Sequence, residues 1–229
     1  MKSAIADFES ILYQRLIPEF CEDPNRGCDI AHFVRESNRL GERDARDFVE
    51  AWNAGLIEHQ GRGLYRATNS AASEQFFWEG RKIQSPRSYT LWMEPVITVA
   101  ALWRLHHTHK WPKHLIGTQS LDWAFDLVAM LPAEPSEYIA GEVKKTSREI
   151  NHLIELMQHF ACTPDAPTPS SGKLRNAYKK VAALRARKAP IFWAIGPEMF
   201  SKVFRVTYHV GGIVDLAPVD DRVLRFPAD

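Results

Sequence analysis

Apolar positions in the first seventy residues follow helical spacing and then change to short strand-like runs. The helical spacing of three and four residues is shown by Ile5, Phe8, Ile11, Leu12 and Leu16. It recurs over 42–55, where Gly55 suits a helix end. A shorter pattern at 30–34 is interpreted as a helix between these two. Two apolar runs around Gly61-Arg62-Gly63 predict a β-hairpin, so three helices and a hairpin are expected.

The rest of the chain alternates between helical and strand patterns. Helices are predicted over 94–107, 148–160 and 173–188, and strands over 113–119, 121–131, 137–146, 189–196 and within 199–218. Pro95 falls in the first turn of its helix, where a missing N–H is tolerated. The order of a helix, three strands, two helices and further strands predicts an α/β fold.

Two polar interruptions divide the pattern. The stretch 71–87 is rich in small and polar residues, and 163–173 is rich in proline and serine, as loops are. The first is interpreted as a linker between an N-terminal domain, 1–70, and a larger domain, 88–229. The second is interpreted as a surface loop.

Composition narrows the classes of protein that this chain can be. It has 229 residues, a formal net charge of +1 and 45% hydrophobic residues, which is enough apolar material for a substantial core. Its three cysteines have no CxxC spacing, and its first residues include acidic ones, unlike a signal peptide. Without an apolar run of roughly 20 residues, we expect a cytoplasmic protein with reduced thiols and no membrane partner.

Charged residues interrupt the apolar patterns at a few positions. Glu142 and Lys144 are two residues apart in a largely apolar strand, so they share one face of it. Asp126 stands within the apolar run of 121–131, and Glu94 heads an apolar helix. Burying such charges is costly unless each has a partner. The strand that carries Glu142 and Lys144 is therefore either a solvent-exposed edge, where lysine is common, or part of a working site. If the register of the run 121–131 differs, Asp122 takes the place of Asp126.

Asp126, the Glu142-Val143-Lys144 tripeptide and Glu94 together resemble the PD-(D/E)xK nuclease superfamily, over residues 88–216. The resemblance implies a restriction-endonuclease-like mixed central sheet flanked by helices. It also implies that Asp126, Glu142 and Glu94 hold Mg²⁺, with Mn²⁺ as a substitute, and that Lys144 orients or helps to deprotonate the attacking water. Phe125 takes the place of the family's proline before the aspartate.

The N-terminal domain is similar to a winged helix-turn-helix, with Arg62 at the tip of the wing. Its third helix carries Glu42, Asp44, Asp47 and Glu50, and this acidity is unfavourable beside phosphates. DNA contact and a role in dimerisation or protein docking therefore stand as equal alternatives for this domain.

The resemblance implies a DNA endonuclease acting in restriction, antiviral defence, repair or element mobility, as a homodimer or in a larger complex. A non-catalytic DNA-binding or assembly protein with a degenerate nuclease fold, and a ribonuclease with the same centre, are the alternatives. The predicted helix 173–188 is basic and contains no acidic residue. We expect its outer face, with Lys173, Lys179, Lys180 and Arg187, to contact the nucleic-acid backbone, while Leu174, Tyr178, Val181 and Leu184 face the sheet.

Overall fold

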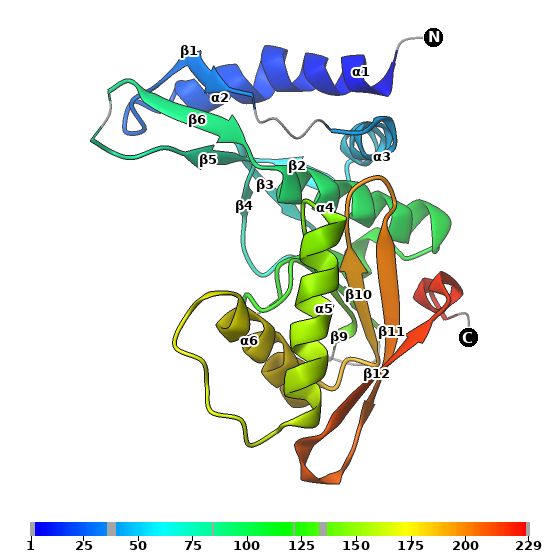
Figure 1. The fold of residues 1–229 in the computed structure, drawn as a ribbon. Helices are drawn as coiled ribbons and strands as arrows, with labels where there is room; N and C mark the ends of the chain where they lie inside the picture. Colours follow the sequence, from blue (N-terminus) through cyan, green and yellow to red (C-terminus); the bar gives the residue numbers. More distant parts are fainter. Residues whose placement is uncertain (1–2, 36–39, 84, 121, 133–136, 228–229) are drawn as a thin grey trace.

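The computed structural model describes residues 3–35, 40–83, 85–120, 122–132 and 137–227 (Figure 1). The chain begins with α1 (Ala4–Ile11), which continues through a π-helical turn, Leu12–Leu16, into α2 (Ile17–Cys21). The Ser3 hydroxyl caps α1 by accepting a hydrogen bond from the Ile5 N–H at 3.2 Å. After a strand comes α3 (Glu42–Asn53), which packs across α1.

The predicted helix at 30–34 is wrong. This segment is β1 (Cys28–Val34), which pairs in parallel with β6 (Arg87–Leu91). β6 also pairs antiparallel with β5 (Phe77–Glu79). Isoleucine, phenylalanine and valine all favour strands, and three apolar positions are too few to distinguish a helix from a strand. The helix–helix–helix–hairpin order expected of a winged helix is therefore not found in the described residues.

The predicted hairpin is confirmed. β2 (Ile57–His59) and β3 (Leu64–Ala67) pair antiparallel, and β4 (Glu74–Gln75) adds to β3. Gly61, Arg62 and Gly63 all have positive φ at the turn, a conformation that glycine adopts without strain. Arg62 lies at the tip of the hairpin, as expected.

The segment 71–87 is not a simple connection between two domains. It contains β4, β5 and the first residue of β6, which pair with strands from both sides of it in the sequence. One hydrophobic cluster joins Phe8 and Phe48 from the N-terminal part to Leu127 and Trp193 from the C-terminal part. The two predicted domains therefore share a core.

The C-terminal part has the predicted element order and is plainly α/β. Within the described residues, six strands form one sheet in the order β12-β11-β10-β9-β8-β7. Their bounds are β7 (Ile116–Thr118), β8 (Leu127–Met130), β9 (Glu137–Val143), β10 (Ile191–Ile195), β11 (Ser201–Tyr208) and β12 (Val214–Val219). β9 and β10 are parallel, and the other neighbouring pairs are antiparallel. The sheet is therefore mixed.

Helices cover both faces of this sheet. α4 (Met93–Trp103), extended by a π-helical turn, shares a cluster with Ile139, Val143 and Trp193 on one face. α5 (Ser147–Cys162) and α6 (Gly172–Arg187) share a cluster with Ala140 and Phe192 on the other. Alternation along β9 places Glu142 on the side of α5 and α6. In the described part of the chain, no helix is long and apolar enough to cross a membrane.

Candidate functional site

The end of β9 carries Glu142 and Lys144 into the space between the sheet and its helices. β9 is a central strand with neighbours on both sides, and the Lys144 N–H continues its pairing by donating to the Ile195 carbonyl at 2.9 Å. Glu142 is almost fully buried. The pair therefore does not lie on an exposed edge strand, which was the simpler of the two interpretations.

Asp126 lies beside this pair because β8 and β9 are antiparallel neighbours. The predicted strand 121–131 begins only at Leu127, after a turn in which Trp123 has φ 61°. Asp126 directly precedes β8, and its carboxylate accepts a hydrogen bond from the Val143 N–H at 2.8 Å. Burial, and then the negative charge of Glu142, raise the pKa of Asp126 to about 8.

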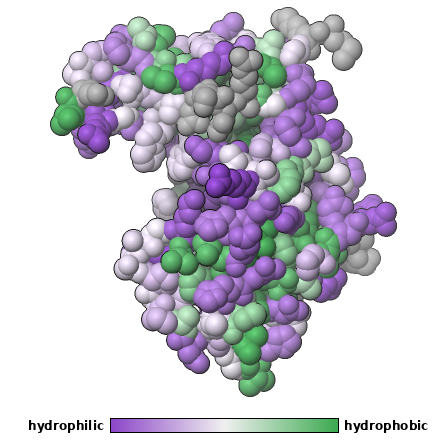
Figure 2. Space-filling view, viewed as in Figure 1, coloured by the Kyte–Doolittle hydropathy of each residue, from purple (hydrophilic) through white to green (hydrophobic). Residues whose placement is uncertain are grey.

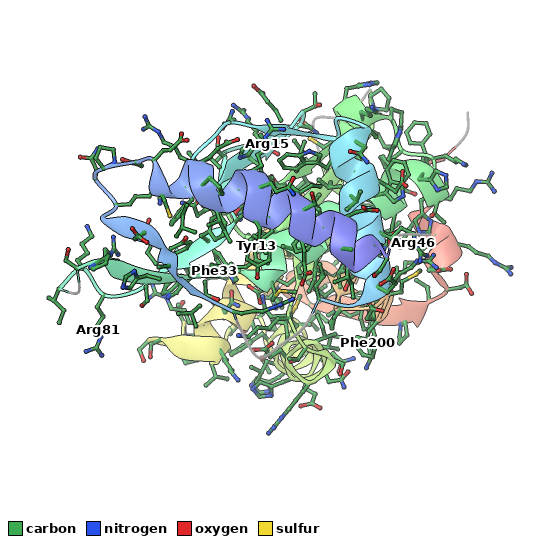
Figure 3. The ribbon with its side chains drawn as sticks, turned by 90° about the horizontal axis from the view of Figure 1, so that it is seen from above. Tyr13, Arg15, Phe33, Arg46, Arg81 and Phe200 are labelled. Atoms are coloured by element: carbon green, nitrogen blue, oxygen red, sulfur yellow. The ribbon has the colours of Figure 1, made fainter. Side chains whose placement is uncertain are left out.

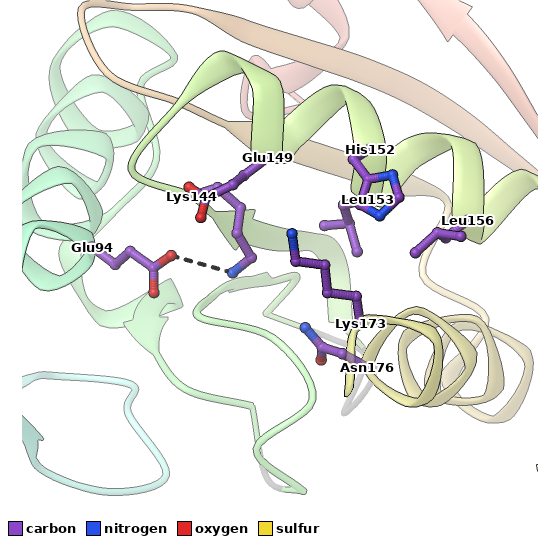
Figure 4. Close-up of a pocket in the computed structure, with 8 residues that line it drawn as sticks. All are labelled: Glu94, Lys144, Glu149, His152, Leu153, Leu156, Lys173 and Asn176. Carbon is purple, nitrogen blue, oxygen red and sulfur yellow. Dashed lines mark ion pairs between the residues drawn. The ribbon is translucent and has the colours of Figure 1, made fainter. Parts of the chain in front are cut away.

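Lys144 connects the carboxylates. Its Nζ lies 2.7 Å from Glu142 Oε1 and 3.5 Å from Glu94 Oε1, and it donates to the Val143 carbonyl at 2.6 Å (Figure 4). Burial alone would lower the pKa of Lys144, but Glu142, Asp126 and Glu94 outweigh it and raise the pKa. Burial raises the pKa of Glu94, opposed by Lys144. The four residues predicted for the metal centre are thus brought together at one end of the sheet.

Lys180 belongs to the same network and is not on an outer helix face. It is buried, donates to the Ala124 carbonyl at 2.7 Å and forms an ion pair with Glu142. Burial alone would raise the pKa of Glu142, but Lys180 and Lys144 together lower it. The sequence carried a signal, since Lys180 stands at helical spacing between Ala177 and Leu184, which are both buried.

The site network, defined as Glu94, Asp126, Glu142, Lys144 and Lys180, has unequal charges. Three carboxylates face two ammonium groups, a formal balance of two minus three, or −1. Among the described residues, no three His, Cys, Asp or Glu side chains are gathered as a ready metal site. The donors are nevertheless hard oxygens around a cation, the setting that Mg²⁺ favours. Asp126, Glu142 and the Val143 carbonyl therefore fit a divalent ion that replaces or shifts an ammonium group.

A pocket of about 190 Å³ opens beside Lys144 and Glu94. Figure 4 shows it between α4, α5 and α6. It is lined by Glu94, Lys144, Glu149, His152, Leu153, Leu156, Lys173 and Asn176. Leu153 and Leu156 make part of the lining apolar. Lys144, which follows β9, and Lys173 of α6 add positive charge. Of the basic residues predicted on α6, Lys173 is the one that lines this pocket.

The other residues predicted to bind nucleic acid are dispersed. Lys179 is exposed on α6, and Arg62 is exposed with Asp23 3.9 Å away. Arg187 forms ion pairs with Asp122 and Glu137, so it is not an open cation on an outer face.

Asp122 and Leu174 also differ from expectation. The Asp122 carboxylate accepts from the Ala124 N–H at 2.9 Å and from the Ser120 hydroxyl at 3.0 Å. Asp122 therefore belongs to the turn before β8. Leu174 is exposed instead of facing the sheet, whereas Val181 and Leu184 are buried as predicted.

The acidic residues of α3 have a structural role that the sequence did not indicate. Asp44 and Asp47 are buried and both accept from Arg104, with Arg104 Nε to Asp47 Oδ2 at 2.6 Å. The Glu198 N–H donates to Asp44 Oδ2 at 2.7 Å. Glu42 accepts from the Ala4 N–H at 2.7 Å at the start of α1. The face of α3 that carries Asp44 and Asp47 is thus packed inside the protein, whereas Glu42 is half-buried and Glu50 is exposed.

Comparisons of the chain with protein-family models, with curated proteins and with solved structures find no match.

Proposed function

We propose that the protein is a divalent-metal-dependent nuclease that hydrolyses DNA phosphodiester bonds at the site network. The observation that carries the proposal is the meeting of Asp126, Glu142 and Lys144, from two neighbouring strands, beside a pocket with a further lysine. The element order α4-β7-β8-β9-α5-α6-β10, with antiparallel β7, β8 and β9 and parallel β9 and β10, supports a PD-(D/E)xK-like core.

The residues divide the chemistry between them. Hydrolysis adds water across a phosphodiester: the water oxygen bonds to phosphorus, the bond from phosphorus to one deoxyribose oxygen breaks, and that oxygen takes up a proton. A divalent ion held by Asp126 and Glu142 would supply positive charge to the phosphate and lower the pKa of bound water. Lys144 stays protonated, because its pKa is raised. Its role is to orient the phosphate and shield its charge, not to accept a proton from water.

A cleavage assay tests the proposal. Supercoiled, linear, single-stranded and branched DNA, and RNA, are incubated with the protein and Mg²⁺, Mn²⁺ or EDTA. We expect cleavage of DNA with either ion and none with EDTA. Asp126→Ala and Lys144→Ala should each reduce cleavage at least about 100-fold, while Asp215→Ala, an exposed carboxylate on β12, serves as the matched control. Full activity in Asp126→Ala would exclude this site.

The non-catalytic alternative has one specific observation in its favour. Both oxygens of Glu142 already contact lysines, Lys144 on one and Lys180 on the other. A protein locked in this state would bind nucleic acid without cutting it. DNA binding with no cleavage under either metal ion would support that function, and cleavage of RNA alone would support a ribonuclease.

A further inference from the structure

Two tryptophans lie exposed on the sheet formed by β1, β6 and β5. Trp78 on β5 is 63% exposed, and Trp92, the residue that follows β6, is 37% exposed. Their ring centroids are 6.2 Å apart in an edge-to-face arrangement. Two exposed tryptophans in contact leave a large apolar area in water, and contiguous exposed apolar area is typical of an interaction surface.

Strand pairing places both rings on the same face. Trp78 is opposite Thr90, and the Trp92 N–H donates to the Phe76 carbonyl at 2.7 Å, which continues the same ladder. Alternation therefore puts Trp78, Thr90 and Trp92 on one side, here called the tryptophan face. Phe77 and Tyr89 point to the other side, where their rings contact Phe20 of α2 at 4.6 and 4.9 Å.

The tryptophan face is turned toward the candidate site. In Figure 1, α2 lies above β6, so the opposite side of this sheet is turned downward, toward the part of the molecule that contains α6. Figure 2 shows the molecular outline hollowed between this overhang and the part below it. Trp92 is also the N-cap residue of α4, and Glu94 of the site network lies in the first turn of that helix. The sheet and the site thus share one continuous stretch of chain.

Positive charge flanks the tryptophan face. Arg81 and Lys82 are exposed in the loop between β5 and β6, and Figure 3 shows Arg81 at the outer end of this hairpin. On the other side, Lys173 and Lys144 line the pocket beside Glu94. Aromatic faces with cations around them are the combination that binds single-stranded nucleic acid, because bases stack on the rings and phosphates meet the cations.

We propose that the tryptophan face stacks unpaired bases of the strand that enters the site, so that the substrate class is single-stranded DNA or a junction with a single-stranded segment. This inference rests on the proposed function, since it takes the polymer at the site network to be a nucleic acid. Trp78 and Trp92 stack against the bases, and the basic residues on either side bind the phosphates. The protein chain between Trp92 and Glu94 directs the nucleic-acid backbone toward Lys144.

Binding in EDTA tests the inference without cleavage. Fluorescence anisotropy of a labelled 20-nucleotide oligo(dT) and of a duplex of equal length is measured with wild type, Trp78→Ala and Trp92→Ala. Each substitution should weaken single-strand binding about tenfold or more and change duplex binding little. The slope of affinity against salt should not change, because tryptophan carries no charge. Trp78→Phe should retain most of the affinity.

Tyr13→Ala is the matched control. Tyr13 is an exposed aromatic that contacts Phe33, whose ring lies against Phe77 and Tyr89 on the helix side of the sheet. It should bind as wild type. Thermal unfolding of each variant shows whether the fold is retained.

Unchanged single-strand affinity in both tryptophan variants would overturn the inference, as would wild type that binds no single strand. Loss of self-association in light scattering, with oligonucleotide binding unaltered, would assign the face to protein contact instead. Tryptophan-dependent binding without cleavage under any metal ion would leave the inference standing and reject the nuclease proposal. Cleavage that is indifferent to both tryptophans would do the reverse.

Discussion

The molecule buries two clusters of carboxylates with cations, one where α3 of the N-terminal part meets the C-terminal part and one at the end of the C-terminal sheet. In the α3 cluster, Arg104 binds Asp44 and Asp47, and the Glu198 N–H donates to Asp44. In the site network, two lysines hold Glu142, and Asp126 and Glu94 remain less well compensated. Charge and periodicity alone do not rank one cluster above the other, and only the family resemblance singled out the residues of the site network.

The type of cation distinguishes them. A guanidinium is planar and always charged, and it presents donors in a fixed fork, so Arg104 can satisfy two carboxylates permanently. An ammonium is a compact point charge without preferred directions, so another small cation can take its place. Burial raises the pKa of Asp44, opposed by Arg104, and it raises that of Asp126 to about 8. Burial of carboxylates is therefore common to both clusters and does not by itself indicate function.

Access also distinguishes them. The site network adjoins the pocket lined by Lys144 and Glu94, whereas Asp44 and Asp47 are enclosed between α3, the turn after α4 and Glu198. A cluster that a ligand can reach, held by exchangeable cations, is suited to chemistry. A cluster closed by arginine is suited to holding helices together.

The largest expected difference in the free energy of unfolding is between the variants Arg104→Leu and Lys144→Met. Arg104→Leu leaves the buried Asp44 carboxylate without its ion-pair partner and Asp47 with only Arg43, 3.9 Å away, and it should lower the free energy of unfolding by about 3–5 kcal/mol. Lys144→Met should cost about 1–2 kcal/mol, because Lys180 still holds Glu142, yet it should remove cleavage. Urea unfolding at pH 7.5 measures both. Arg46→Ala, at an exposed arginine of α3 (Figure 3), is the control. Equal decreases in the free energy of unfolding of the two test variants would contradict the distinction between the two clusters.

Lys180→Met tests whether an ammonium of the site network can be exchanged for a metal ion. The change leaves Glu142 and the Ala124 carbonyl without their donor, at a cost of about 1–3 kcal/mol. It also makes the site more negative by one charge. The rise in melting temperature produced by Mg²⁺ should therefore be larger in this variant than in wild type. An identical Mg²⁺ effect in both proteins would show that Lys180 does not compete with the ion.

Asp126→Asn tests the uncompensated charge through pH. The pKa of Asp126 is about 8 in the folded protein and 3.8 for an ordinary aspartate. The folded state therefore favours the protonated form, and this stabilisation is complete below pH 3.8 and is lost as pH rises through 8. Asparagine does not ionise, so its free energy of unfolding does not carry this dependence on pH. Relative to wild type, the free energy of unfolding of the variant should therefore rise by about 2 kcal/mol between pH 5 and pH 8.5, a figure discounted for the partial exposure of Asp126.

Urea unfolding in EDTA at the two pH values measures this effect. Asp215→Asn, at an exposed position, should show no such dependence on pH. If the free energy of unfolding of Asp126→Asn differed from that of wild type by the same amount at pH 5 and pH 8.5, Asp126 would be ionised throughout this range.

Much of the C-terminal part could be predicted because its patterns are long and distinct. The sixteen residues of α5 carry a regular apolar stripe, and the apolar strand at 189–196 matches β10. The spacing of Glu142 and Lys144 was enough to put them on one face of their strand. Asp126 was predicted inside the neighbouring strand, and only the family resemblance implied that it would meet them. Regular periodicity over many residues, and strands adjacent in sequence, carry that information locally.

The failures come from contacts between distant parts of the chain. β1 is a strand because β6, more than fifty residues later, pairs with it, and three apolar residues could not show this. Lys180 joins Glu142 across 38 positions, and Asp44 meets Glu198 across 154. A basic or acidic helix looks solvated in sequence, since charge without knowledge of its partner is most often at the surface.

The smallest expected effects concern Lys179 and Arg62, which represent the two parts of the molecule at its surface. Lys179 is exposed on the helix that also supplies Lys173 to the pocket, whereas Arg62 lies 3.9 Å from Asp23, which offsets its charge. Lys179→Ala should weaken DNA binding about two- to threefold at low salt and reduce the salt slope by about one contact. Arg62→Ala should change neither the DNA affinity nor the salt slope, because Asp23 lies close to the positive charge of Arg62. Anisotropy titrations over a range of salt measure both. A larger effect of Arg62→Ala would place DNA on the hairpin and restore the N-terminal part as a binding surface.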